Sequence, residues 1–77
     1  DISGQFDLIF ANITVQTLLD LLGAFRGHLR PSGYLVVSGI LVNQGETFLK
    51  KSKNYGLEKA GIRRSGEWIS YRLKKKP

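Results

Sequence analysis

Asn12 carries the functional group best suited to chemistry in this 77-residue sequence, and it directly follows the apolar run 6–11. Its amide offers both a hydrogen-bond donor and an acceptor. Taken alone, an asparagine in this place is most simply a turn former that ends a strand by hydrogen bonding to its own backbone. A ligand-binding amide is the alternative, and it needs an independent observation in its favour.

Other kinds of site are excluded or weakly supported by the residue types. The sequence has no cysteine and a single histidine, His28, so we expect neither disulfides nor a metal site. His28 falls near the end of a predicted helix, where a favourable contact with the helix dipole is the simpler role. Asp7 and Asp20 lie inside a predicted strand and a predicted helix, so no residue stands out as a general base.

The elements that position Asn12 follow from hydrophobic spacing. Runs 6–11 and 34–38 are apolar on both faces, which is typical of interior strands in a parallel sheet. Between them, one apolar stripe at helical spacing predicts a helix with Thr14 as its N-cap. Gly27 and Pro31 mark the end of this helix, and residues 30–33 read as a turn. The stripe consists of Val15, Leu18, Leu22, Phe25 and Leu29.

The second half of the chain predicts one helix and a hairpin. The helix covers about residues 44–55, with Phe48, Leu49 and Tyr55 pointing inward. Residues 57–63 and 68–73 are expected to be strands, joined by a turn at Ser65-Gly66 into an antiparallel hairpin. The order β-α-β-α-β-β predicts an α/β fold, the second half of a doubly wound sheet with one reversed strand.

Charge is unevenly distributed along the chain, which carries a net charge of +6. Residues 1–49 sum to −2, whereas residues 50–77 sum to +8. Nucleic acid is therefore a possible partner. A solvated helix face and a basic tail are favoured, because no aromatic residues are interleaved as in an RNA-binding motif. No run approaches the roughly 20 apolar residues that a membrane-spanning helix needs.

Three segments in order resemble a known enzyme family. They read DLIFANI (7–13), LVVSGIL (35–41) and GEWI (66–69). Together they are similar to the methyltransferases that modify large-subunit ribosomal protein eleven, members of the Rossmann-like, S-adenosylmethionine-dependent class. The turn LRPSG (29–33) resembles the turn that leads into the fifth strand of that class, with Ser32 in place of a usual glycine. The resemblance covers residues 6–73.

The resemblance implies a fold, a reaction and a set of site residues. The fold would be the C-terminal half of a methyltransferase sheet whose last strand is antiparallel. The enzyme would be cytoplasmic and would use S-adenosylmethionine to methylate amino groups, a lysine side chain or an N-terminal amine, of a ribosomal protein. Asn12 would be catalytic and would also help to bind the cofactor, with Ile13 as an apolar floor. Gly39 and Ile40, on the same rim, would contact the substrate.

Several parts of such an enzyme are not recognised in this sequence. No G-x-G-x-x-G loop occurs among its nine glycines, and no strand precedes Phe6 to hold one. We expect residues 1–77 to be a single partial domain, part of a longer protein, that alone neither binds S-adenosylmethionine tightly nor transfers methyl groups. The alternatives are the same fold acting on another protein, a nucleic acid or a small molecule, and a non-enzymatic RNA-binding module. An exposed edge on the first strand could also drive self-association.

Overall fold

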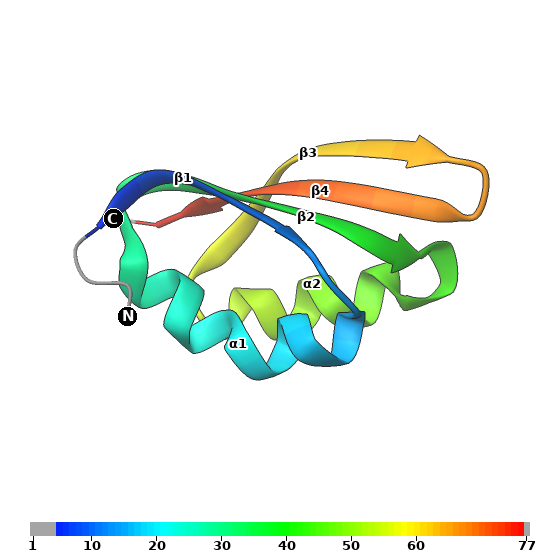
Figure 1. Ribbon diagram of the computed structural model, residues 1–77, viewed down its shortest axis with the longest axis horizontal. Helices are drawn as coiled ribbons and strands as arrows, with labels where there is room; N and C mark the ends of the chain where they lie inside the picture. Colours follow the sequence, from blue (N-terminus) through cyan, green and yellow to red (C-terminus); the bar gives the residue numbers. More distant parts are fainter. Residues whose placement is uncertain (1–4, 77) are drawn as a thin grey trace.

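A four-stranded sheet with two helices on one face forms the protein (Figure 1). The computed structural model describes residues 5–76. The strands are β1 (Phe6–Asn12), β2 (Leu29–Leu41), β3 (Leu57–Ser65) and β4 (Trp68–Lys75). The helices are α1 (Val15–His28), a 3-10 turn η1 (Val42–Gln44) and α2 (Gly45–Lys53). This is the predicted β-α-β-α-β-β order.

The sheet has the strand order β1-β2-β4-β3. β1 pairs with β2 in parallel, and β4 is antiparallel to both β2 and β3. The last strand is therefore inserted between two others, and it alone is reversed. This arrangement confirms the predicted α/β fold with one antiparallel strand.

Both helices pack on the same face of the sheet (Figure 1), because each connects parallel strands in the same direction across the sheet, from β1 to β2 and from β2 to β3, and such crossovers are right-handed. Each helix buries apolar residues that repeat at helical spacing. The Thr14 hydroxyl accepts a hydrogen bond from the Thr17 backbone N–H at 3.3 Å and caps α1, as predicted. Leu18 and Leu22 on α1 are fully buried, as is Phe48 on α2. The core residues are Ala11, Leu18, Leu22, Leu29, Leu35, Val37, Ile40, Phe48, Leu57, Ile69, Tyr71 and Leu73.

The structure differs from the prediction between the first helix and second strand. Residues 30–33 belong to β2, and Leu29 is the first residue of that strand rather than the end of the helix. The reason is that Leu29 pairs with Phe6, after which the β1–β2 register shifts. The backbone bends sharply here, since a Cβ on Gly33 would lie only 2.8 Å from the Arg30 carbonyl oxygen. Ser32 has φ +65° at this bend.

The second helix is shorter than predicted. α2 ends at Lys53, and Gly56 then turns the chain with φ +70°. Tyr55 therefore lies outside the helix and is 40% exposed, so its predicted inward position was wrong. Its ring lies beside Gly23 of α1, about 3.5 Å from where a Cβ on that glycine would be. Neither helix within residues 5–76 is long and apolar enough to cross a membrane.

Candidate functional site

Asn12 and Gly39 lie together at the carboxyl ends of two neighbouring parallel strands. Asn12 is the last residue of β1 and pairs with Ser38 of β2. Gly39 has φ +80°, and a Cβ at this position would lie 3.2 Å from Asn12 Oδ1. A side chain at residue 39 would therefore crowd the amide and strain the backbone. In open α/β sheets, this end of the strands is where ligands bind.

The Asn12 side chain is exposed to solvent. Within residues 5–76 it makes no hydrogen bond, so its amide does not cap the local backbone as a simple turn former would. An exposed amide without a partner beside a glycine can accept a hydrogen bond from an incoming N–H and donate one to an incoming oxygen.

The other two predicted site residues face the interior. Ile13 is half-buried and packs against the core, although its carbonyl oxygen lies near Gly39. Ile40 is fully buried in the core. Any contact of Ile40 with a substrate would therefore be made by its backbone and not by its side chain. The predicted substrate-binding role of Ile40 stays a prediction.

A pair of serines next to Asn12 was missed by the sequence analysis. The Ser70 hydroxyl donates a hydrogen bond of 3.1 Å to the Ser38 hydroxyl across β2 and β4. The two side chains lie on the sheet face that carries no helix, and they help to line a hollow of about 540 Å³. Residues 38 and 70 are 32 positions apart, so only knowledge of the strand pairing could have brought them together.

A smaller hollow, of about 280 Å³, lies at the carboxyl end of β2. It is lined by Leu41, Val42, Asn43 and Glu67. The Val42 N–H donates to the Glu67 carbonyl oxygen at 2.8 Å, which ties the β3–β4 turn to this end of the sheet. Glu67 belongs to the GEWI segment, and its carboxylate gives this edge a group that could attract a cationic amine.

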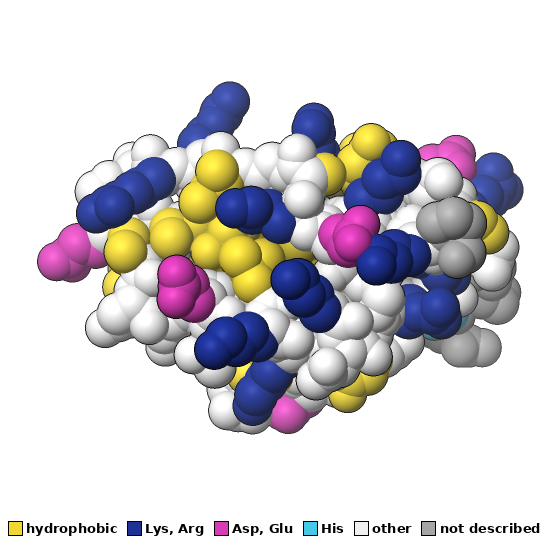
Figure 2. All heavy atoms as spheres, turned by 180° about the vertical axis from the view of Figure 1, so that it is seen from behind, with side chains coloured by type: hydrophobic (Ala, Val, Ile, Leu, Met, Phe, Trp, Pro, Cys, Tyr) yellow, Lys and Arg dark blue, Asp and Glu magenta, His cyan; other side chains and the backbone are white. Residues whose placement is uncertain are grey.

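Basic side chains are spread over the face of the molecule seen in Figure 2, where they surround an apolar area and are interrupted by acidic side chains. Lys50, Lys53 and Lys59 line a hollow together with Glu46. Within residues 5–76 no group of three or more histidine, aspartate or glutamate side chains is placed to hold a metal ion.

Comparison with solved structures identifies the class of the fold. A 16S rRNA N2 G1207 methyltransferase from T. thermophilus, solved with AdoMet and guanosine, superposes with a TM-score of 0.77 at 22% identity, over 99% of this chain and 22% of that one. Identity this low shows the fold alone. The protein therefore has part of a Rossmann-like methyltransferase fold.

Closer relatives identify the family. The family model for ribosomal protein L11 methyltransferase (PrmA) matches residues 1–76. The chain is 38% identical over 77 residues to the ribosomal protein L11 methyltransferase of Geotalea daltonii, covering all of this chain and 24% of the relative. The crystal structure of ribosomal protein L11 methylase from Lactobacillus delbrueckii subsp. bulgaricus superposes with a TM-score of 0.92 at 32% identity, covering 100% of this chain and 40% of that one.

The chain belongs to the ribosomal protein L11 methyltransferase (PrmA) family, as its three segments indicated. It spans about a quarter of the length of the curated relatives it matches.

Proposed function

We propose that this chain supplies the Asn12 side of the active site in an enzyme that methylates amino groups of ribosomal protein L11, on a lysine side chain or an N-terminal amine. Family membership supports the substrate class. The observation that carries the site is the exposed Asn12 amide, which has no partner within residues 5–76 and lies against Gly39 at the strand ends.

The residues present suit S-adenosylmethionine and an acceptor amine. When bound, S-adenosylmethionine supplies a methyl group on a positively charged sulfur. The Asn12 Oδ1 atom would accept a hydrogen bond from the acceptor amine and hold the nitrogen lone pair in line with that methyl group. Gly39, lacking a side chain, would let the substrate backbone approach. The amine must be neutral to react, and its proton would leave to solvent because no base faces Asn12 on β1 or β2.

The contribution of Asn12 can be measured in a chimera. The chain would replace the matching segment of the Geotalea daltonii enzyme, which it matches over its full length. We expect Asn12→Ala to lower kcat for L11 methylation about 100-fold, the cost of losing the orientation of a reacting group. Asn43→Ala, at the neighbouring hollow, is the matched control and should retain most of the activity. Equal activities in the two variants would show that Asn12 has no catalytic role.

The remaining partners follow from the same proposal. The enzyme would be cytoplasmic, where ribosomal proteins are made and assembled. Nucleic acid is not favoured, because acidic side chains interrupt the basic ones (Figure 2). RNA binding that weakens steeply with salt would favour that alternative instead. In the isolated chain, the outer edge of β1 would be available for self-association.

A further inference from the structure

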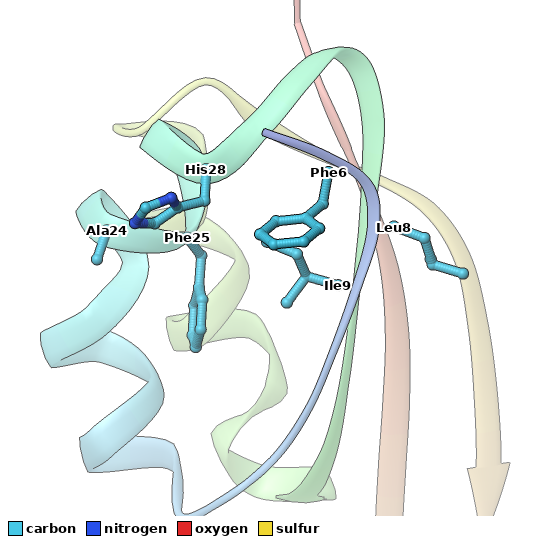
Figure 3. A pocket seen from close by; sticks show the side chains of 6 residues that line it. All are labelled: Phe6, Leu8, Ile9, Ala24, Phe25 and His28. Carbon is cyan, nitrogen blue, oxygen red and sulfur yellow. The ribbon is translucent and has the colours of Figure 1, made fainter. Parts of the chain in front are cut away.

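Four hollows on the surface of residues 5–76 differ in the charge of their lining. The hollow of about 400 Å³ between β1 and α1 is largely apolar, and Figure 3 shows Phe6 and Ile9 of β1 pointing toward Phe25 of α1. Two arginines line the hollow of about 540 Å³, and three lysines with one glutamate line that of about 370 Å³. The hollow of about 280 Å³ at the end of β2 differs from these, because Glu67 lines it and no basic side chain does. We call it the Glu67 hollow.

The Glu67 carboxylate is exposed and makes no ion pair or hydrogen bond within residues 5–76. Each of the other acidic side chains in this range lies next to a basic side chain or accepts a hydrogen bond. They are Asp7, Asp20, Glu46 and Glu58. The charge of Glu67 is therefore not used to hold these residues together, which leaves it available to a ligand.

Two hydrogen bonds hold the backbone around the Glu67 hollow in place. The Val42 N–H donates to the Glu67 carbonyl oxygen at 2.8 Å, which joins the β3–β4 turn to the end of β2. Arg64 Nε donates to the Gly66 carbonyl oxygen at 3.1 Å within the same turn. Arg64 is thus engaged at the turn and does not line the hollow. The backbone that carries the carboxylate is fixed before a ligand arrives, which lowers the cost of binding.

The lining suits an aliphatic chain that ends in a positive charge. Leu41 and Val42 supply half-buried apolar surface, and the Glu67 carboxylate can accept hydrogen bonds from an ammonium group. Lysine combines a methylene stem with such a charged head. The hollow is also far larger than the roughly 30 Å³ that one water molecule occupies, so it has room for a lysine side chain.

The Glu67 hollow lies at the same end of the sheet as Asn12 but does not include it. Asn12 pairs with Ser38, and the hollow begins at Leu41, three residues farther along the chain. At about 3.3 Å per residue, the separation is at most about 10 Å. A group bound at Glu67 is therefore not the amine that reacts at Asn12, but a second group of the same substrate. In an extended peptide, this distance corresponds to about three residues.

We propose that the Glu67 hollow is a specificity subsite for a lysine side chain of L11 that is not itself being methylated and lies about three residues from the reacting amine. This inference rests on the proposed function, which supplies L11 as the substrate. The charge of the lysine is recognised by Glu67 and not by the neutral amide of Asn43. Because this contact is the same before and during methyl transfer, it should lower KM and leave kcat unchanged.

The test uses the chimera in which this chain replaces the matching segment of the Geotalea daltonii enzyme. Glu67→Gln keeps the size of the side chain and removes its charge. We expect this variant to bind fluorescently labelled L11 about fivefold more weakly by anisotropy, and to raise KM about fivefold with kcat changed less than about twofold. Asp20→Asn, at an exposed carboxylate on α1, is the matched control and should stay within about twofold of the unsubstituted chimera. If the two variants, both folded by circular dichroism, bind L11 equally well, the proposal is wrong.

A double-mutant cycle identifies the bound side chain. Each lysine of L11 is replaced in turn by methionine, which keeps an aliphatic chain but carries no charge. We expect one replacement to weaken binding to the unsubstituted chimera about fivefold and to have no further effect on the Glu67→Gln variant. If no lysine shows this coupling, or if the coupled lysine lies more than about six residues from every methylated amine, the proposal is overturned.

Binding and methylation together distinguish the subsite from the proposed function. A chimera whose L11 binding depends on Glu67 but which transfers no methyl group would support the subsite and count against the proposed function alone. Normal methylation, with L11 binding and KM that do not respond to Glu67→Gln, would support the proposed function and overturn the subsite.

Discussion

Ser32 is the single residue with a left-handed backbone outside glycine in residues 5–76, at φ +65°. The segment 29–33 resembles the turn that leads into the fifth strand of Rossmann-like methyltransferases, in which the residue at the position of Ser32 is usually glycine. This conformation is less favourable by about 1 kcal/mol for a residue with a Cβ than for glycine. The serine therefore keeps the bend before β2 at a cost that glycine would avoid.

Ser32→Gly should raise the free energy of unfolding by about 1 kcal/mol, because it relieves the left-handed strain. Urea denaturation followed by circular dichroism would measure the change. Ser65→Gly is the control, because Ser65 ends β3 without a positive φ and glycine there should lower stability. A loss of stability in Ser32→Gly would contradict the strain argument.

The fold disturbs the ionisation of Tyr71. Burial raises the pKa of Tyr71 above its usual value of 10.0, and the negative charge of Glu46 adds to this effect. Its ring stacks on Phe48 with the centroids 6.3 Å apart. Because the folded-state pKa lies above the unfolded one, the stabilising contribution is complete below about pH 10 and is lost as pH rises through the folded pKa.

We therefore expect the stability of the protein to fall above pH 10 more steeply than in a Tyr71→Phe variant, which cannot ionise at this position. Thermal unfolding at a series of pH values would measure the difference, and lysine titration cancels in the comparison. Tyr55→Phe, at an exposed tyrosine, should keep the wild-type pH dependence. Identical profiles for all three proteins would exclude Tyr71 as the source.

At the scale of the elements, a buried ammonium group joins the end of α1 to the sheet. Lys75 Nζ donates hydrogen bonds to the Arg26 carbonyl oxygen at 2.9 Å and to the Leu29 carbonyl oxygen at 2.6 Å. These carbonyls lie at the carboxyl end of the helix, where a positive charge is favourable. Lys75 is only 9% exposed, whereas the neighbouring Lys74 and Lys76 are exposed. The expected basic tail is wrong at Lys74 and Lys75, because both belong to β4.

Lys75→Met keeps the aliphatic stem but removes the donor. We expect it to lower the free energy of unfolding by about 2 kcal/mol, since two buried carbonyls lose a charged partner. Lys74→Met, one residue earlier and exposed, should change stability by less than about 0.5 kcal/mol. Urea denaturation compares the variants, and equal effects would mean that Lys75 acts only through packing.

Much of the element pattern could be predicted from the sequence, because it depends on local periodicity. The stripe containing Leu18 and Leu22 defined α1, and the alternation of Ile69, Tyr71 and Leu73 defined the buried face of β4. The extension of β2 back to Leu29 could not be predicted, because it depends on pairing with Phe6, 23 residues earlier in the chain.

The candidate site was predictable in part for a similar reason. Asn12 and Gly39 each follow an apolar run, and parallel strands bring such positions to one edge. The burial of Ile40 was not foreseen, because the β2–β4 register shifts between Val37 and Ile40 and changes the expected alternation. A local pattern cannot reveal a bulge that depends on a distant partner strand.

At the scale of the whole molecule, the candidate site lies at the end of a strand that exposes large apolar side chains. Leu8, Phe10 and Asn12 alternate with the core residues of β1, so all three belong to the same side of the sheet. The Asn12 amide therefore ends an apolar row on the sheet face that carries no helix within residues 5–76.

The insertion of β4 between β2 and β3 has a consequence for biosynthesis. β3 leaves the ribosome before β4, yet it has no direct neighbour in the sheet until β4 arrives to separate it from β2. Until β4 has been synthesised, the backbone hydrogen-bonding groups of β3 therefore have no partner strand. β1 and β2 can pair earlier, but β3 can join the sheet only after translation has passed residue 75. A chain that stops within β4 would leave β3 and one edge of β2 unpaired, which makes it prone to aggregation.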